Sequence, residues 1–140
     1  MEHIPVLKLG PILMVSIQVD LHDTMATNLQ DDILYKVEQT GARAVLVDIT
    51  ALDIVDSFIA RILSDTAAMA RIMGAEVVLV GMRPTVTMTL VEMGMNLPNV
   101  KTAIDIESGL RKLGYELRQI HQAEEDEITS LLLRSSYETD

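Results

Sequence analysis

The sequence predicts an α/β domain in which a mixed β-sheet packs with about four helices, in the order ββαβαβαβα. Two segments, RAVLVDI (43–49) and EVVLVGM (76–82), are continuous β-branched runs without alternation of polar residues. Such runs are typical of parallel strands that are covered on both faces. Because 140 residues suit one compact unit, we expect a single domain over residues 1–120, followed by an acidic tail over residues 121–140.

The first part of the chain is expected to form a hairpin and then a helix. IPVLKL (4–9) and ILMVSIQV (12–19) are apolar runs joined by a Gly-Pro pair, which breaks regular structure. From Asp23, a preferred cap residue, apolar residues recur every four positions until Gly41, which permits a left-handed stop. This spacing predicts an amphipathic helix.

Three further helices and a last strand follow from the same periodicities. The segment 57–74 has one apolar stripe at helical spacing and separates the two parallel runs. Pro84 fits the first turn of a short, very apolar helix, and NVKTA is the candidate last strand. Asp105 is then expected to cap a final helix over residues 106–120.

Composition and charge exclude several classes of function. The formal net charge of −10 argues against a nucleic-acid surface and against binding to anionic membranes. The absence of cysteine removes disulfides and thiolate metal sites, and the opening MEHIPVLK lacks the pattern of a signal peptide. We therefore expect a cytoplasmic protein, with a tail that is either disordered or a short helix.

Motifs of catalysis and cofactor binding are missing. The glycines have neither dinucleotide-binding nor P-loop spacing, and the three histidines are far apart. Asp48 could accept a phosphoryl group as in receiver-like domains, but no acidic pair at a neighbouring strand supplies the metal site that this chemistry needs. Asp48, Asp53 and Asp56 together could bind a cation, although a solvated acidic loop is the commoner case. We expect no catalytic residue, no metal and no cofactor.

Ser57 is the candidate that remains. In open α/β sheets functional loops gather beyond the carboxyl ends of parallel strands, and TALDIVDS (50–57) and GMRP (81–84) are two such loops. One interpretation is that Ser57 caps the following helix through its side-chain oxygen. The other is that its hydroxyl is phosphorylated, since a helix N-terminus favours the added negative charge. The two interpretations are compatible.

LDIVDSFIARIL (52–63), preceded by ARAVLVDIT and followed by MGAEVVLVGMRPTVTMTLVEMG, resembles the STAS domains of anti-sigma factor antagonists. Within that superfamily it is most similar to the small RsbS-type scaffolds of the bacterial stressosome. The resemblance spans roughly residues 4–118. In SpoIIAA-like antagonists the serine is typically followed by small residues, whereas Phe58 and Ile59 follow Ser57 here, which favours the scaffold type.

The resemblance implies a non-catalytic phosphoswitch scaffold for stress signalling. Ser57 matches the family's phosphorylated serine, and an RsbT-like serine kinase would modify it. The unphosphorylated scaffold, assembled with RsbR-like STAS paralogues in a large hetero-oligomer, would hold this kinase. Phosphorylation would release the kinase to activate a downstream regulator, and an RsbX-like phosphatase would reset the state. The residues expected to contact partners are Asp53, Asp56, Phe58, Ile59, Arg61 and Arg83.

Two alternatives stay open at this point. A SpoIIAA-like antagonist of an anti-sigma factor would use the same serine in a small complex. A small-molecule-binding α/β domain would need a pocket with convergent polar groups, which the sequence does not indicate.

Overall fold

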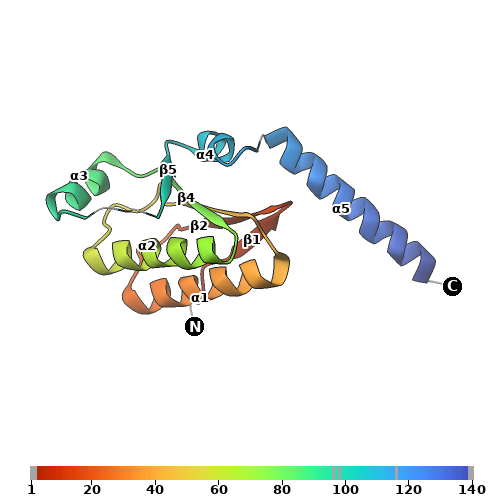
Figure 1. The fold of residues 1–140 in the computed structure, drawn as a ribbon, viewed down its shortest axis with the longest axis horizontal. Helices are drawn as coiled ribbons and strands as arrows, with labels where there is room; N and C mark the ends of the chain where they lie inside the picture. Colours follow the sequence, from red (N-terminus) through yellow and green to blue (C-terminus); the bar gives the residue numbers. More distant parts are fainter. Residues whose placement is uncertain (1–2, 96, 98, 116, 139–140) are drawn as a thin grey trace.

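A computed structural model describes residues 3–95, 97, 99–115 and 117–138 of the chain. A five-stranded sheet with the strand order β1-β2-β3-β4-β5 lies at its centre (Figure 1). The strands are β1 (Val6–Leu9), β2 (Ile12–Ser16), β3 (Ala44–Asp48), β4 (Glu76–Val80) and β5 (Lys101–Ala103). The helices are α1 (Asp23–Thr40), α2 (Ser57–Ile72), α3 (Pro84–Glu92), α4 (Ile106–Lys112) and α5 (Leu117–Glu138).

The sheet is mixed, as the sequence predicts. β1 pairs antiparallel with β2, whereas β2, β3, β4 and β5 are parallel neighbours. β3 and β4 lie in the middle, and Val45, Leu46, Val78 and Leu79 are at most 1% exposed. The interpretation of the two β-branched runs as central parallel strands is therefore confirmed, and so is the α/β fold class. The carboxyl end of β3 leads into the loop before Ser57, the first residue of α2, and the carboxyl end of β4 leads into the loop that contains Arg83.

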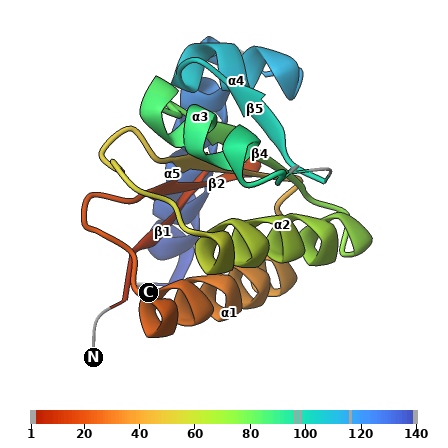
Figure 2. The ribbon, with the colours of Figure 1, turned by 90° about the vertical axis from the view of Figure 1, so that its left-hand side faces the viewer.

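Helices cover both faces of the sheet. α1 and α2 lie side by side on one face and α4 lies on the other (Figure 2). The larger core, between the sheet and α1 and α2, also takes in Val86 and Leu90 of α3. The smaller core packs Leu110 of α4 on the opposite face. Gly109 allows this contact, because a Cβ atom there would lie 2.8 Å from a methyl carbon of Val80.

The helix caps differ in part from the prediction. Asp23 was the expected cap of α1, but it is the first helical residue, and the cap is His22, whose Nδ1 accepts from the backbone N–H of Met25 at 3.4 Å. An imidazole is a less common cap acceptor than a carboxylate, so residue preferences favoured the neighbouring aspartate. Gly41 ends α1 as expected, with φ of 64° and its N–H bound to the carbonyl of Val37.

The C-terminal region also departs from the prediction. The single helix expected over residues 106–120 is wrong, because α4 ends at Lys112 and Gly114 takes the left-handed conformation with φ of 84°. A new 22-residue helix, α5, starts at Leu117 and continues through residues 121–138, part of the segment 121–140 where a disordered tail or a short helix was expected. Leu, Gln, Ala and Glu residues of this segment favour a helix. α5 extends away from the sheet (Figure 1). No helix among the described residues is both long and apolar enough to span a bilayer.

Candidate functional site

The loop between β3 and α2 is anchored by two buried side chains. Leu52 is 0% exposed and Val55 is 2% exposed, so both belong to the main core. The residues between and after them point outward: Asp53 is exposed and Ile54 is 79% exposed. Because its apolar anchors fix the loop from below, the outward residues form a defined surface at the carboxyl end of β3.

The first turn of this loop is fixed by the last residue of β3. Asp48 Oδ1 accepts from the backbone N–H of Thr50 at 2.9 Å and from the Thr50 hydroxyl at 2.5 Å. Gly81, at the end of β4, lies directly against this turn. It has φ of 76°, and a Cβ atom built on it would lie 1.9 Å from Thr50 Oγ1. Only glycine fits this close approach without rearrangement. The two loops are therefore packed together beyond the carboxyl ends of β3 and β4.

Arg83 connects the second loop to the first. Its Nε donates to the carbonyl oxygen of Thr50 at 2.8 Å, and its guanidinium is also hydrogen-bonded and ion-paired to Asp53. The side chains of Arg83 and Asp53 are 47% and 69% exposed, so their ion pair adds little to stability. The contacts of Arg83, which follows β4, instead position the loop that leads to Ser57.

Ser57 is exposed and is the first residue of α2. The interpretation of Ser57 as the cap of this helix is wrong. Asp56 is the cap, because it has extended backbone dihedrals and its Oδ1 accepts from the backbone N–H of Ile59 at 2.8 Å. Both residues are preferred at caps, and they are adjacent, so spacing alone did not decide between them.

The other expected partner-binding residues divide into exposed and buried ones. Phe58 is 41% exposed and Arg61 is exposed, both near the start of α2. Ile59 is 2% exposed and lies in the main core, so its side chain offers no docking surface and that expectation is corrected. The apolar stripe of α2 includes Ile59, a signal that already favoured burial. Ile54 was not among the predicted partner-binding residues. It is an apolar side chain that is highly exposed between acidic residues, and this exposure makes it a candidate contact residue.

The three carboxylates near the site do not converge. Asp48 binds Thr50, Asp53 pairs with Arg83, and Asp56 caps α2. Within the described ranges no group of three His, Cys, Asp or Glu side chains is placed to hold a metal ion. Each acid therefore has a structural partner of its own.

A cavity of about 720 Å³ lies beside the site, with Asp48, Thr50, Arg83 and Asp105 in its lining. Asp105 caps α4 through a bond of 2.8 Å from the Ser108 backbone N–H. This bond and one from the Ser108 side chain hold the pKa of the Asp105 carboxyl below its ordinary value. Each of these four lining residues is hydrogen-bonded within the protein, so these four do not form a set of free polar groups aimed at a ligand.

Comparison with known proteins agrees with this architecture. Residues 3–106 match the family model of the STAS domain. The RsbT co-antagonist protein RsbRA of Bacillus subtilis (strain 168) is 29% identical over 86 residues, which make up 61% of this chain and 31% of RsbRA. The chain thus spans less than a third of the length of that relative.

Two solved structures are similar over most of this chain. An RsbS variant from Moorella thermoacetica has 32% sequence identity and a TM-score of 0.69, covering 79% of this chain and 94% of that chain. The second is a chain of a solved structure described as the molecular architecture of the stressosome, a signal integration and transduction hub. It has 31% sequence identity and a TM-score of 0.62, covering 79% of this chain and 96% of that chain. Since the family model covers well over half of its residues, the chain belongs to the STAS domain family.

Proposed function

We propose that this chain is a non-catalytic phosphoswitch scaffold of a stressosome-like complex. In its unphosphorylated form it binds and sequesters an RsbT-like serine kinase. Phosphorylation of Ser57 releases the kinase, which then activates a downstream regulator, and an RsbX-like phosphatase restores the original state. The assembly contains RsbR-like STAS paralogues and lies in the cytoplasm.

The position of the Ser57 hydroxyl carries this proposal. It is exposed at the first residue of α2, while the neighbouring Asp56 makes the cap bond. A phosphate on Ser57 therefore replaces no structural hydrogen bond of the helix start. At a helix N-terminus the macrodipole favours an added negative charge by about 0.3 to 1 kcal/mol. The fold can thus accept the modification, and its consequence falls on the surface.

The surface around Ser57 suits a partner that binds an uncharged serine. Ile54 and Phe58, on either side of Ser57 in the sequence, are 79% and 41% exposed and offer apolar contact area. Asp53 and Asp56 add acidic groups to the same loop. A phosphate would add about 1.5 to 2 negative charges beside them. A partner that docks acidic groups there would then meet like-charge repulsion, and the phosphate would also have to be desolvated in the interface.

The comparisons support STAS paralogues and an RsbT-like kinase as partners in the proposal. The chain is similar to RsbS and to a stressosome chain, both at about a third sequence identity. RsbRA is described as a co-antagonist of RsbT, which favours a kinase of that kind. The M. thermoacetica structure carries a serine-to-glutamate substitution, a change that adds negative charge as a phosphate does.

Reconstitution with a purified RsbT-like kinase tests the proposal. Without ATP, the kinase should co-elute with the chain in gel filtration. With ATP, mass spectrometry should locate phosphate on Ser57, and the kinase should elute separately. Ser57→Ala should keep the kinase bound in both conditions, while the matched control Ser130→Ala, at an exposed serine of α5, should behave as the wild type.

Other outcomes would overturn the proposal. Phosphate on another residue, or release of the kinase from Ser57→Ala upon addition of ATP, would show that Ser57 is not the switch. A SpoIIAA-like antagonist is distinguished by size, because it stays in a small complex when RsbR-like paralogues are added, whereas a scaffold enters a large particle.

A further inference from the structure

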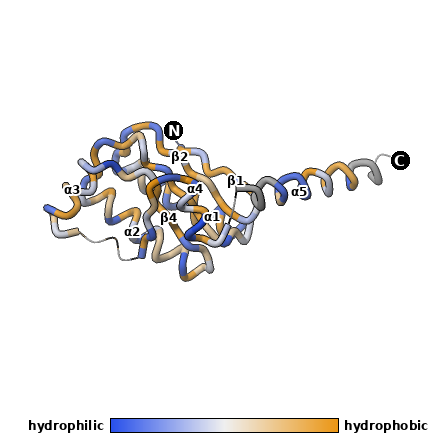
Figure 3. Tube along the Cα trace, turned by 90° about the horizontal axis from the view of Figure 1, so that it is seen from above, coloured by the Kyte–Doolittle hydropathy of each residue, from blue (hydrophilic) through white to orange (hydrophobic). Residues whose placement is uncertain are grey.

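Helix α5 exposes a group of large aliphatic side chains. Ile128, Leu131, Leu132 and Leu133 are 57%, 55%, 66% and 56% exposed, and the apolar segments of α5 are visible in Figure 3. Ile128, Leu131 and Leu132 have the spacing i, i+3, i+4, which places them on one side of the helix. This spacing is the pattern of a helix that docks into an apolar groove. Grouped exposed apolar side chains mark interaction sites.

α5 lies at one edge of the sheet. Lys8 of β1 pairs with Glu127 of α5, with 2.9 Å between Lys8 Nζ and Glu127 Oε2. β1 is the edge strand, and α5 continues past it into solvent (Figure 1). The turn before the aliphatic group also carries Glu124 and Asp126. The part of α5 that projects from the domain therefore has an apolar side, which is preceded in the chain by an acidic turn.

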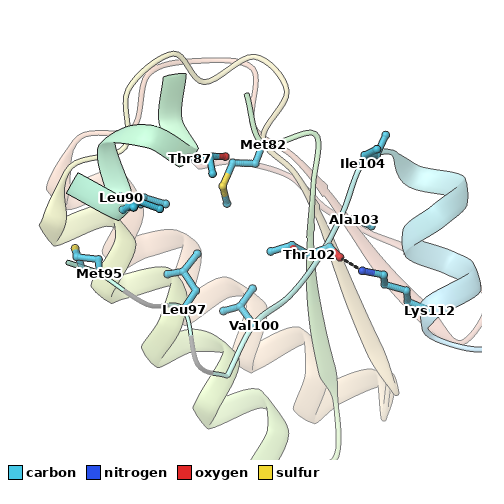
Figure 4. A pocket seen from close by; sticks show the side chains of 11 residues that line it. Met82, Thr87, Leu90, Met95, Leu97, Val100, Thr102, Ala103, Ile104 and Lys112 are labelled. Atoms are coloured by element: carbon cyan, nitrogen blue, oxygen red, sulfur yellow. Dashed lines mark hydrogen bonds between the residues drawn. The ribbon is translucent and has the colours of Figure 1, made fainter. Parts of the chain in front are cut away.

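A groove of complementary character lies at the opposite edge of the sheet. It runs between α3 and β5, has a volume of about 580 Å³, and is lined by apolar side chains that include Met82, Leu90 and Val100 (Figure 4). This volume lies within the range of ligand-binding clefts. Val91, which also lines the groove, is 71% exposed. Among the described residues that line the groove, Lys112 is the charged one. It is exposed and donates a hydrogen bond to the Thr102 carbonyl.

The helix and the groove match in chemistry but cannot meet within one molecule as it stands. β1 and β5 are separated by three strands, which at about 4.8 Å per strand puts them about 19 Å apart. In this structure Glu127 of α5 lies at the β1 edge, where it pairs with Lys8. We propose that the α3–β5 groove binds α5 of a second copy of this chain, with Ile128, Leu131 and Leu132 in the groove and the acidic turn near Lys112.

This contact joins two different surfaces, so it is heterologous. Each copy offers one helix and one groove, at opposite ends of the molecule (Figure 1). Association through such surfaces continues from copy to copy and gives a closed ring or an open chain. It does not depend on the state of Ser57, and it adds a self-assembly surface that is separate from the proposed kinase-binding loop.

Sedimentation velocity on the full chain, from about 10 µM to about 1 mM, tests the inference. We expect concentration-dependent association, which Leu131→Asp/Leu132→Asp in α5 and Val91→Asp in the groove should each weaken at least about tenfold. Ile72→Asp is the matched control, because Ile72 is an apolar residue of α2 that is 88% exposed. All substituted positions are exposed, and circular dichroism melts verify that each variant is folded.

A mixture of the helix variant and the groove variant gives the sharper result. The groove variant keeps an intact α5 and the helix variant keeps an intact groove, so the mixture should form a one-to-one pair and nothing larger. Absence of this pair would contradict the inference, as would a wild-type chain that is monomeric at every concentration. Association lost in the helix variant but unchanged in the groove variant would mean that α5 pairs with α5, and would also overturn it.

Discussion

Removing the carboxylate of Asp56 should destabilise the domain more than removing the hydroxyl of Ser57. Asp56→Ala loses the bond of 2.8 Å between the carboxylate and the Ile59 backbone N–H, and cap losses of this kind cost about 0.5 to 2 kcal/mol. Asp56→Asn keeps a cap acceptor, so it should be nearly neutral. Ser57→Ala removes an exposed side chain that is not the cap, and such surface changes stay within about 0.5 kcal/mol.

Thermal melts followed by circular dichroism, together with urea titrations, measure these differences. For a domain of this size, a loss of about 1 kcal/mol lowers Tm by about 3 to 6 °C. We expect a decrease of this order for Asp56→Ala and a much smaller change for Asp56→Asn and Ser57→Ala. A loss in Ser57→Ala that equals or exceeds the loss in Asp56→Ala would refute the assignment of the cap.

Three further predictions follow from the described contacts. Gly81→Ala should destabilise by about 1 to 3 kcal/mol in urea titrations, since its Cβ would clash with the Thr50 side chain at positive φ. Because hydrogen bonds lower the folded-state pKa of Asp105, its carboxylate stabilises the domain above the unfolded-state pKa, and this contribution is lost as pH falls through the folded-state pKa. The stability difference between wild type and Asp105→Ala should therefore shrink on acidification, as urea titrations at neutral and acidic pH would measure. Removing residues 122–140 should leave Tm nearly unchanged, because an exposed ion pair attaches this part of α5 to β1.

The sequence predicts the sheet well because its signals are local. The runs that became β3 and β4 are apolar apart from Asp48 at the end of β3 and Glu76 at the start of β4. Burial on both faces is the condition that such composition meets. Gly41 and Pro84 mark a helix end and a helix start through their own backbone preferences. The break between α4 and α5 was missed because Leu113, Leu117 and Ile120 continue an apolar helical spacing across Gly114, and one glycine is compatible with a helix interior.

The site is less accessible to sequence reasoning because its contacts are long-range. The loop of Ser57 was predicted from the rule that loops follow parallel strands, but the tie between Arg83 and Thr50 joins residues far apart in the chain. The choice between Asp56 and Ser57 as the cap depends on backbone dihedrals. The burial of Ile59 could have been predicted from its place in the apolar stripe of α2, whereas the groove between α3 and β5 depends on how two elements pack.

Kinase affinity before and after phosphorylation of Ser57 tests the central claim most directly. Titration calorimetry of the RsbT-like kinase against the unmodified chain and against the chain phosphorylated at Ser57 should show weaker binding to the phosphorylated form. Like-charge contact in a desolvated interface costs about 2 to 4 kcal/mol, which corresponds to about 30-fold to 1,000-fold in affinity. Equal affinity for the two forms, with both shown to be folded by circular dichroism, would contradict the release mechanism.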